Sequence, residues 1–248
     1  MPGIRSIIYL WLGSTMKFKY LLAGITALSL IASAQASTIL SENFDNFSSL
    51  TGKGWVIKNL SDDPTTVTDP VTKVKSVVSW DQGNPGAAFN AQAGADNSYA
   101  GVNYATTAGN IIDNWLFSPV FSISGGGVIS FYTRSVDHSF ADNMEVRMSG
   151  SGASTNTSDF ALQFEINPGL DADGYPTDWT QYVITIPEGT AQSTGRLAFR
   201  YFLADASATG NYIGIDSLNV VPEPATMMSL GIGLLALMTM RRRRNGSV

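Results

Sequence analysis

The sequence has no cysteine, and it has a single histidine, His138, among its 248 residues. The absence of cysteine excludes disulfide bridges, thiolate metal sites and cysteine nucleophiles. One histidine cannot supply the pair that a His-Glu-x-x-His zinc site needs, and no Gly-x-Ser-x-Gly nucleophile turn occurs. His138 lies in the polar stretch Val-Asp-His-Ser, which favours a surface position. The sequence therefore predicts a protein that is not an enzyme.

Basic side chains are scarce between the two ends of the chain. Residues 37–221 hold eight lysine and arginine side chains against 19 aspartate and glutamate side chains, a net charge of −11. An acidic surface repels phosphate backbones, which excludes nucleic acid as a partner. The charge favours solubility outside the cell, with cation binding as the alternative.

The N-terminal segment has the three parts of a secretory signal peptide. These parts are the basic residues Lys17 and Lys19, the apolar run Leu21–Ile31, and the small-x-small cleavage site Ala34-Gln35-Ala36. Residues 1–36 are therefore the predicted leader, signal peptidase is the expected processing enzyme, and the mature protein begins near Ser37. Residues 1–15 precede the pattern, and Met16 is an alternative start of the natural chain.

The C-terminal segment contains three features in order. They are Pro222-Glu223-Pro224, an apolar run from Met227 to Met240, and the cluster of Arg241, Arg242, Arg243 and Arg244. The apolar run is shorter than the roughly 20 residues that a membrane-spanning helix needs, although Ala225 and Thr226 extend it. The arginines would stay on the cytoplasmic side of a membrane. These features alone predict a membrane tail anchor.

In combination with the signal peptide, residues 222–244 resemble the PEP-CTERM sorting signal of Gram-negative bacteria. The resemblance implies a transmembrane sorting helix that holds the precursor at the inner membrane. It also implies that exosortase, a membrane enzyme similar to transpeptidases, cuts near Pro-Glu-Pro, after which the protein reaches the cell surface or the extracellular matrix. Proteins with this signal accompany exopolysaccharide and biofilm production. The prolines keep the motif extended, which suits a protease cleft.

Residues 37–221 alternate apolar and polar side chains and have no long helical periodicity. The clearest strand patterns are Val128–Tyr132, Met144–Met148, Phe160–Ile166, Tyr182–Ile186 and Arg196–Leu203. Turns rich in glycine, proline and asparagine separate them. The pattern predicts one all-β domain, a β-sandwich or jelly roll. Two long loops, residues 81–114 and 149–159, are the expected places for binding residues.

The order of several short motifs is similar to that of the choice-of-anchor J domain, which is related to cleaved-adhesin and MAM-like jelly rolls. The motifs are Glu42–Asp45, Asn114–Pro119, Ile129–Tyr132, Asp142–Ser149, Trp179–Tyr182, Arg196–Tyr201 and Tyr212–Asp216. The resemblance covers residues 38–220. It implies that the first and last strands lie side by side, and the family has no established catalytic activity.

Many jelly rolls tie their first and last strands together with a structural calcium ion held by carboxylates and backbone carbonyls. Glu42 and Asp45 begin the domain, Asp216 lies in its last strand, and the resemblance brings these segments together. The three residues are the candidate calcium site, with Asp142 as a weaker addition. The alternative is that all are ordinary surface carboxylates. Asp171–Gly174 looks like part of a calcium loop but fails the EF-hand pattern, which favours a turn.

Aromatic side chains in or beside loops are the candidate ligand contacts, because an aromatic ring with a polar edge suits a saccharide. The candidates are Trp80, Tyr99, Tyr104 and Tyr175. The alternative for each is a place in the core, which is the position expected of Trp55, Trp115 and Trp179.

Three functions remain in view. The first is an exported, non-enzymatic surface or matrix protein that acts in adhesion or in association with extracellular polysaccharide. The second is a lectin-like carbohydrate-binding module, which aligned aromatics would support and buried aromatics would count against. The third is a glycan-active enzyme, which two neighbouring carboxylates in a cleft would support. Glu145 and Glu165 lie on predicted strands, where glutamates are usually solvated or salt-bridged.

Overall fold

The computed structural model describes residues 38–222 except residues 69, 71–72, 74, 87, 123–125 and 188–193. The predicted leader and all but Pro222 of the predicted sorting segment lie outside the described residues. The described residues form strands, turns and four short 3-10 helices, which are η1 (Phe47–Ser49), η2 (Thr51–Lys53), η3 (Tyr104–Thr106) and η4 (Thr157–Asp159). No helix in this part of the chain is long and apolar enough to cross a membrane.

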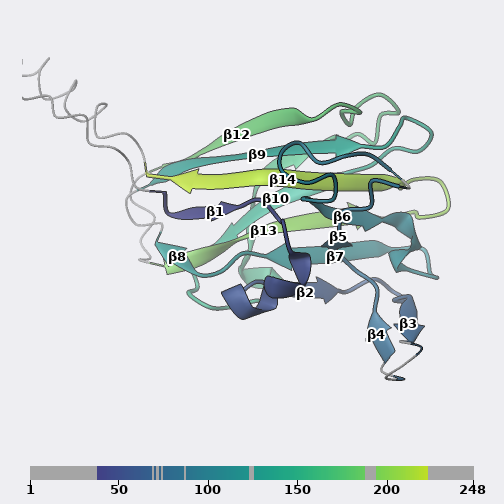
Figure 1. Cartoon of the computed structure of the whole chain (residues 1–248), viewed down its shortest axis with the longest axis horizontal. Helices are drawn as coiled ribbons and strands as arrows, with labels where there is room; N and C mark the ends of the chain where they lie inside the picture. The colour runs from purple at the N-terminus through teal and green to yellow at the C-terminus, as the bar shows by residue number, and fades with distance from the viewer. Residues whose placement is uncertain are drawn as a thin grey trace, which may run out of the picture. The chain divides into compact units, whose positions relative to one another are not determined.

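Two antiparallel sheets, here called sheet A and sheet B, pack face to face (Figure 1). Sheet A contains, in spatial order, β12 (Thr180–Ile186), β9 (Gly127–Ser135), β14 (Tyr212–Val221), β6 (Ala100–Asn103) and β5 (Asp81–Gln82), with β1 (Leu40–Glu42) also paired to β14. Sheet B contains β11 (Ala161–Ile166), β10 (Met144–Ser149), β13 (Thr194–Leu203), β7 (Ile112–Phe117) and β2 (Val56–Asn59), with β8 (Phe121–Ser122) also paired to β13. The predicted all-β sandwich is confirmed.

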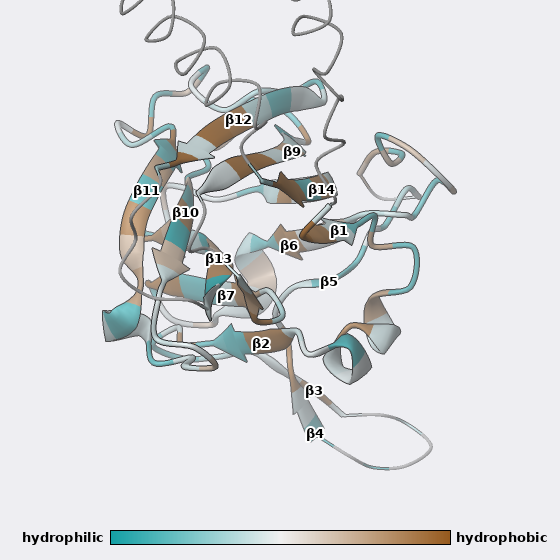
Figure 2. Ribbon diagram, turned by 90° about the vertical axis from the view of Figure 1, so that its left-hand side faces the viewer, coloured by the Kyte–Doolittle hydropathy of each residue, from teal (hydrophilic) through white to brown (hydrophobic). Residues whose placement is uncertain are grey.

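The alternating patterns produce this arrangement because successive side chains of a strand point to opposite faces of its sheet. Strand β9 alternates buried and half-buried residues along its whole length. Its inward residue Phe131 meets Phe199 of β13 with ring centroids 5.0 Å apart. Figure 2 shows hydrophobic stretches on the strands of both sheets. Burial of this apolar surface, at about 25 cal/mol per Å², is the main force that holds the sheets together.

The prediction of a long loop over residues 81–114 is wrong. This segment contains β5, β6 and the start of β7, and β6 is almost completely buried. Strand β6 reads Ala-Gly-Val-Asn, so it lacks the large alternating residues that mark a strand in sequence. Gly101 belongs there because a Cβ atom at this position would lie 2.0 Å from the hydroxyl oxygen of Tyr212.

The first and last strands of the domain are neighbours, as the family resemblance implies. Leu40 of β1 lies opposite Val220 of β14, and Glu42 lies opposite Leu218. The described chain therefore starts and ends at one end of the sandwich. Strand β14 begins at the other end with Tyr212, which is paired with Asn103.

A separate two-stranded hairpin consists of β3 (Thr66–Thr68) and β4 (Lys75–Val77). The hairpin projects from the sandwich below β2 and β7 (Figure 1). All six strand residues are exposed. A hairpin of this size contributes little stability by itself. Its side chains are therefore not required for the stability of the sandwich.

Candidate functional site

The side chains of the predicted calcium ligands do not form a cluster. Glu42 is paired with Lys53, whose ammonium nitrogen lies 3.0 Å from Oε2, and it also accepts a hydrogen bond from the backbone N–H of Phe44. Asp216 accepts hydrogen bonds from backbone N–H groups. Among the described residues, no group of three or more histidine, cysteine, aspartate or glutamate side chains is placed to hold a metal ion. Calcium binding by Glu42, Asp45 and Asp216 stays an untested prediction.

Asp216 fastens a loop to the last strand. Its Oδ2 atom accepts hydrogen bonds from the backbone N–H groups of Gln92 and Ala93, at 2.9 and 3.1 Å. The next residue, Ser217, has a φ of 51° and donates its backbone N–H to Oδ1 at 2.5 Å. Burial of the carboxyl group raises the pKa of Asp216 to about 6, and the backbone donors only partly oppose this rise.

Asp142 is an internal structural residue. It is 1 % exposed, and its carboxylate accepts hydrogen bonds from the hydroxyl groups of Ser135 and Tyr201 and from the backbone N–H of Asn211. Burial raises the pKa of Asp142 as well. Both carboxylate oxygens of Asp142 thus accept hydrogen bonds in the domain interior, and its addition to the calcium site stays an untested prediction.

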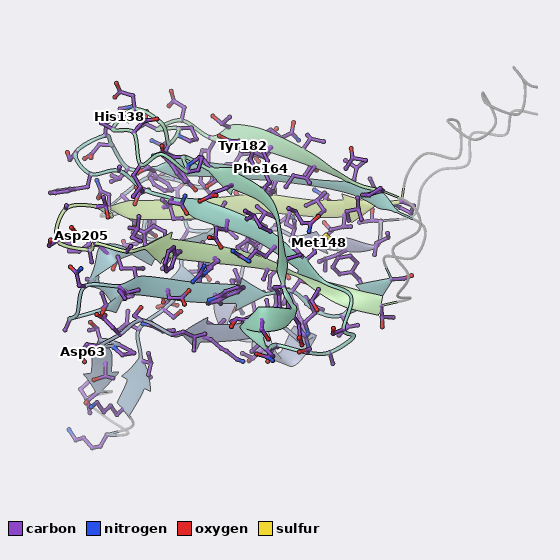
Figure 3. The ribbon with its side chains drawn as sticks, turned by 180° about the vertical axis from the view of Figure 1, so that it is seen from behind. Asp63, His138, Met148, Phe164, Tyr182 and Asp205 are labelled. Atoms are coloured by element: carbon purple, nitrogen blue, oxygen red, sulfur yellow. The ribbon has the colours of Figure 1, made fainter. Side chains whose placement is uncertain are left out.

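The sequence predicted two surface features that the structure confirms. His138 is exposed, and its Nδ1 lies 3.1 Å from the backbone oxygen of Ala172 (Figure 3). Residues 171–174 form a turn that is held from inside by the Asn167 side chain, which bonds the backbone oxygen and the backbone N–H of Asp171. Neither feature presents the residue pattern of a catalytic or EF-hand site.

Three of the four predicted ligand-binding aromatics are buried, and ligand binding by the four stays an untested prediction. Trp80, Tyr99 and Tyr175 are at most 3 % exposed. Their polar atoms bond the protein itself, as in the hydrogen bond from Trp80 Nε1 to the backbone oxygen of Asn114. Only Tyr104, at 55 % exposed, offers a ring to a ligand. These positions therefore provide no aligned aromatic platform.

A packed aromatic cluster, formed by Phe89, Tyr99, Trp179 and Tyr212, covers part of the outer face of sheet A. Neighbouring rings in this cluster lie 5.1–6.4 Å apart, and the Arg134 guanidinium lies 4.4 Å from the Phe89 ring centroid. Trp179, expected in the core, is half-buried and donates its Nε1–H to the backbone oxygen of Asn90. The cluster is a second, smaller layer of packing beneath a loop.

A groove of about 540 Å³ opens between strand β2 and the β3–β4 hairpin, a size typical of small-molecule sites. Its apolar lining residues are Phe47, Ile57, Val67, Val77, Val78 and Trp80, and its polar ones are Asn59, Ser76, Ser79 and Asp81. Val67 and Val77 are 55 % and 53 % exposed, so the hairpin leaves apolar side chains in contact with solvent. Of the residues that line this groove, the sequence analysis named only Trp80 as a candidate ligand contact, because a short threonine- and valine-containing segment reads as an ordinary loop.

The outer face of sheet B contains a network of charged side chains. Glu145 lies directly opposite Glu165 in the pairing of β10 with β11. Arg147 and Arg200 both bond the Glu145 carboxylate, while Asn143 donates to Glu165 at 2.8 Å. The two glutamates are thus adjacent, but neither lines the groove, and both are held in hydrogen bonds typical of a structural network.

Residues 220–244 match the family model of the PEP-CTERM protein-sorting motif. The chain carries this sorting signal. PEP-CTERM signals imply export, temporary anchoring in a membrane and processing by exosortase, so this is an exported surface protein. The match includes Pro222, Glu223, Pro224 and the four arginines named above; except for Val220, Val221 and Pro222, the motif lies outside the described residues.

Solved structures with a similar arrangement include adhesin and carbohydrate-binding domains. The K1 cleaved adhesin domain of Lys-gingipain from Porphyromonas gingivalis W83 is 21 % identical, with a TM-score of 0.49 over 74 % of this chain and 98 % of that chain. TmCBM61, solved with β-1,4-galactotriose, is 12 % identical, with a TM-score of 0.39 over 73 % of this chain and 99 % of that chain. At these values the likeness assigns no ligand to the PEP-CTERM protein. A search of curated proteins gave no match.

Proposed function

We propose that this PEP-CTERM protein is a non-enzymatic component of the cell surface or extracellular matrix of a Gram-negative bacterium and acts in adhesion or exopolysaccharide association. The observation that supports this most directly is the position of the sorting motif. The motif begins at Val220, within the last strand of a single β-sandwich. This position supports the proposal that the chain between the predicted leader and the motif is one domain delivered for display or release.

The groove between β2 and the β3–β4 hairpin is the candidate site for a polysaccharide. The exposed side chain of Val67 can pack against the C–H face of a sugar ring, and Asn59, Ser76, Ser79 and Asp81 place polar atoms beside it. A lectin-like function in this groove would use apolar side chains and hydroxyl groups in place of aromatic stacking. The groove contains one carboxylate among its lining residues, which supports binding without glycoside hydrolysis.

Substitution of Val67 tests this proposal. Val67 lies opposite Ser76 in the hairpin and lines the groove with it, so Val67→Asp places a charge where a sugar face would pack, and binding of mature protein to the host's purified exopolysaccharide should weaken at least about tenfold. The protein is taken from the host's extracellular fraction, and binding is measured by isothermal titration calorimetry.

Val183→Asp is the matched control, because Val183 is 62 % exposed on β12 and does not line the groove. This variant should bind as the unmodified protein does. Equal binding by both variants would show that the groove is not the polysaccharide site. Failure of the unmodified protein to bind would contradict the exopolysaccharide function itself.

A further inference from the structure

The sorting motif and the folded domain share residues. The motif match begins at Val220, whereas β14 continues to Val221. Val220 is completely buried and is paired on one side with Leu40 of β1 and on the other with Ile129 of β9. The first residue of the motif is thus part of the hydrophobic core as well as part of the signal.

The end of β14 is held from both sides. On the β1 side, the backbone N–H of Ile39 donates to the backbone oxygen of Val220 at 2.7 Å. On the β9 side, Val221 is paired with Val128. A Cβ atom at Gly127 would lie 2.6 Å from the backbone oxygen of Val221, so glycine at 127 lets the end of β14 approach β9 closely.

Pro222 follows Val221 directly, so the chain has no spacer between the sheet and the Pro-Glu-Pro segment. Proteolytic and transpeptidase-like enzymes bind their substrates as extended chain, often by pairing with the substrate backbone. An enzyme that contacts even the two residues before Pro222 needs the backbone groups of Val220 and Val221. In the folded domain these residues are already paired in sheet A.

We propose that the folded sandwich controls its own processing, because the end of β14 must separate from β1 and β9 before the enzyme can bind the Pro-Glu-Pro segment. This inference rests on the proposed exosortase processing. Ends of strands open more readily than whole domains unfold, and the rate of cleavage follows the open population when opening is fast. The pairing of β14 thus sets how long the precursor stays tethered.

The test inserts Gly-Ser-Gly-Ser-Gly-Ser between Val221 and Pro222 of the full-length protein in its native host. Pulse-chase labelling, followed by intact mass, measures the conversion of precursor to mature protein. The spacer gives the enzyme extended chain without opening the sheet, so conversion should be several-fold faster. The same six residues between Ala172 and Asp173, in an exposed turn, are the control and should leave the rate unchanged.

A second variant acts without any insertion. Gly127→Ala forces the end of β14 away from β9, so it should also speed conversion, whereas Gly52→Ala, with no atom within 4 Å of the added Cβ, should not. Thermal melting of the mature proteins checks that both variants fold. Conversion at the original rate with the spacer and with Gly127→Ala would overturn the inference while leaving exosortase processing intact. No conversion of the unmodified protein would overturn the processing itself.

Discussion

Among single residues, the buried carboxyl groups show most clearly how the fold constrains function. Asp142 and Asp216 are each at most 1 % exposed, and hydrogen-bond donors of the domain surround both. From the sequence alone, an aspartate near a strand end that binds a metal ion cannot be distinguished from one that accepts a hydrogen bond from a backbone amide. Only the structure shows that their partners are Ser135, Tyr201 and the amides of residues 92 and 93.

The raised pKa of Asp216 predicts a pH dependence of stability. Its pKa is about 6 in the fold against 3.8 for an ordinary aspartate, so the folded state binds the proton more tightly between these values. Ionisation therefore costs the folded state free energy, and the contribution of Asp216 to the free energy of unfolding falls as pH rises from about 4 to about 6. Asp216→Asn should remove this part of the slope when urea unfolding is followed at several pH values.

Asp205→Asn is the control for that measurement. The pKa of Asp205 is lowered by hydrogen bonds from Ser207, so its contribution is lost only as pH falls below the ordinary range of aspartate. This variant should keep the slope between pH 4 and 6. An unchanged slope in the Asp216 variant would contradict the account of that carboxyl group.

At the scale of elements, glycine positions determine where aromatic side chains can pack on sheet A. Gly214 of β14 lies beneath Phe89 and Tyr99, and Gly101 of β6 lies beneath Tyr212. These glycines sit inside strands, where glycine normally weakens the sheet. The aromatic cluster provides the physical reason for them.

Gly214→Ala should destabilise the domain by about 1–3 kcal/mol, because the added Cβ would lie 2.9 Å from ring atoms of both Phe89 and Tyr99. Gly52→Ala, in an open position on η2, should change the free energy of unfolding little or stabilise the domain slightly. Chemical denaturation of the mature proteins compares the two. Equal stability of both variants would mean that the cluster is looser than the structure shows.

The strands also differ in whether the sequence could predict them. Strands β9 to β13 were predictable, since each has a long alternating pattern of large apolar residues. Strand β6 was not predictable, because it has small residues where the other strands have large apolar ones. The ring of Tyr212, from β14, occupies the space beside Gly101. The buried state of Trp80, Tyr99 and Tyr175 was not predictable either, since their neighbours come from distant parts of the chain.

At the scale of the whole molecule, charge is unevenly distributed over the described sandwich. The loops at the end opposite Val221, residues 104–111, 136–143, 167–179 and 204–211, contain six aspartates and no lysine or arginine. Figure 3 shows His138 and Asp205 at this end, with Asp63 near the hairpin. The net charge of −11 over residues 37–221 repels acidic polymers, so the account favours a neutral polysaccharide, whose binding should persist at high salt.

The sorting signal was predictable at this scale because it depends on linear order, and the family match confirms it. The groove was not, because it requires the hairpin to lie beside β2. The overlap between the sorting motif and the folded domain, in strand β14, became visible only when the register of β1, β9 and β14 was known.

The central claim is that the chain is exported, held briefly at the membrane by residues 222–244 and then processed. The most direct test is the intact mass of the protein from the extracellular and membrane fractions of its native host. The account predicts a mature species that begins near Ser37 and ends near Pro224, found outside the inner membrane. A full-length species that stays in the inner membrane, with Arg241 to Arg244 still attached, would contradict it.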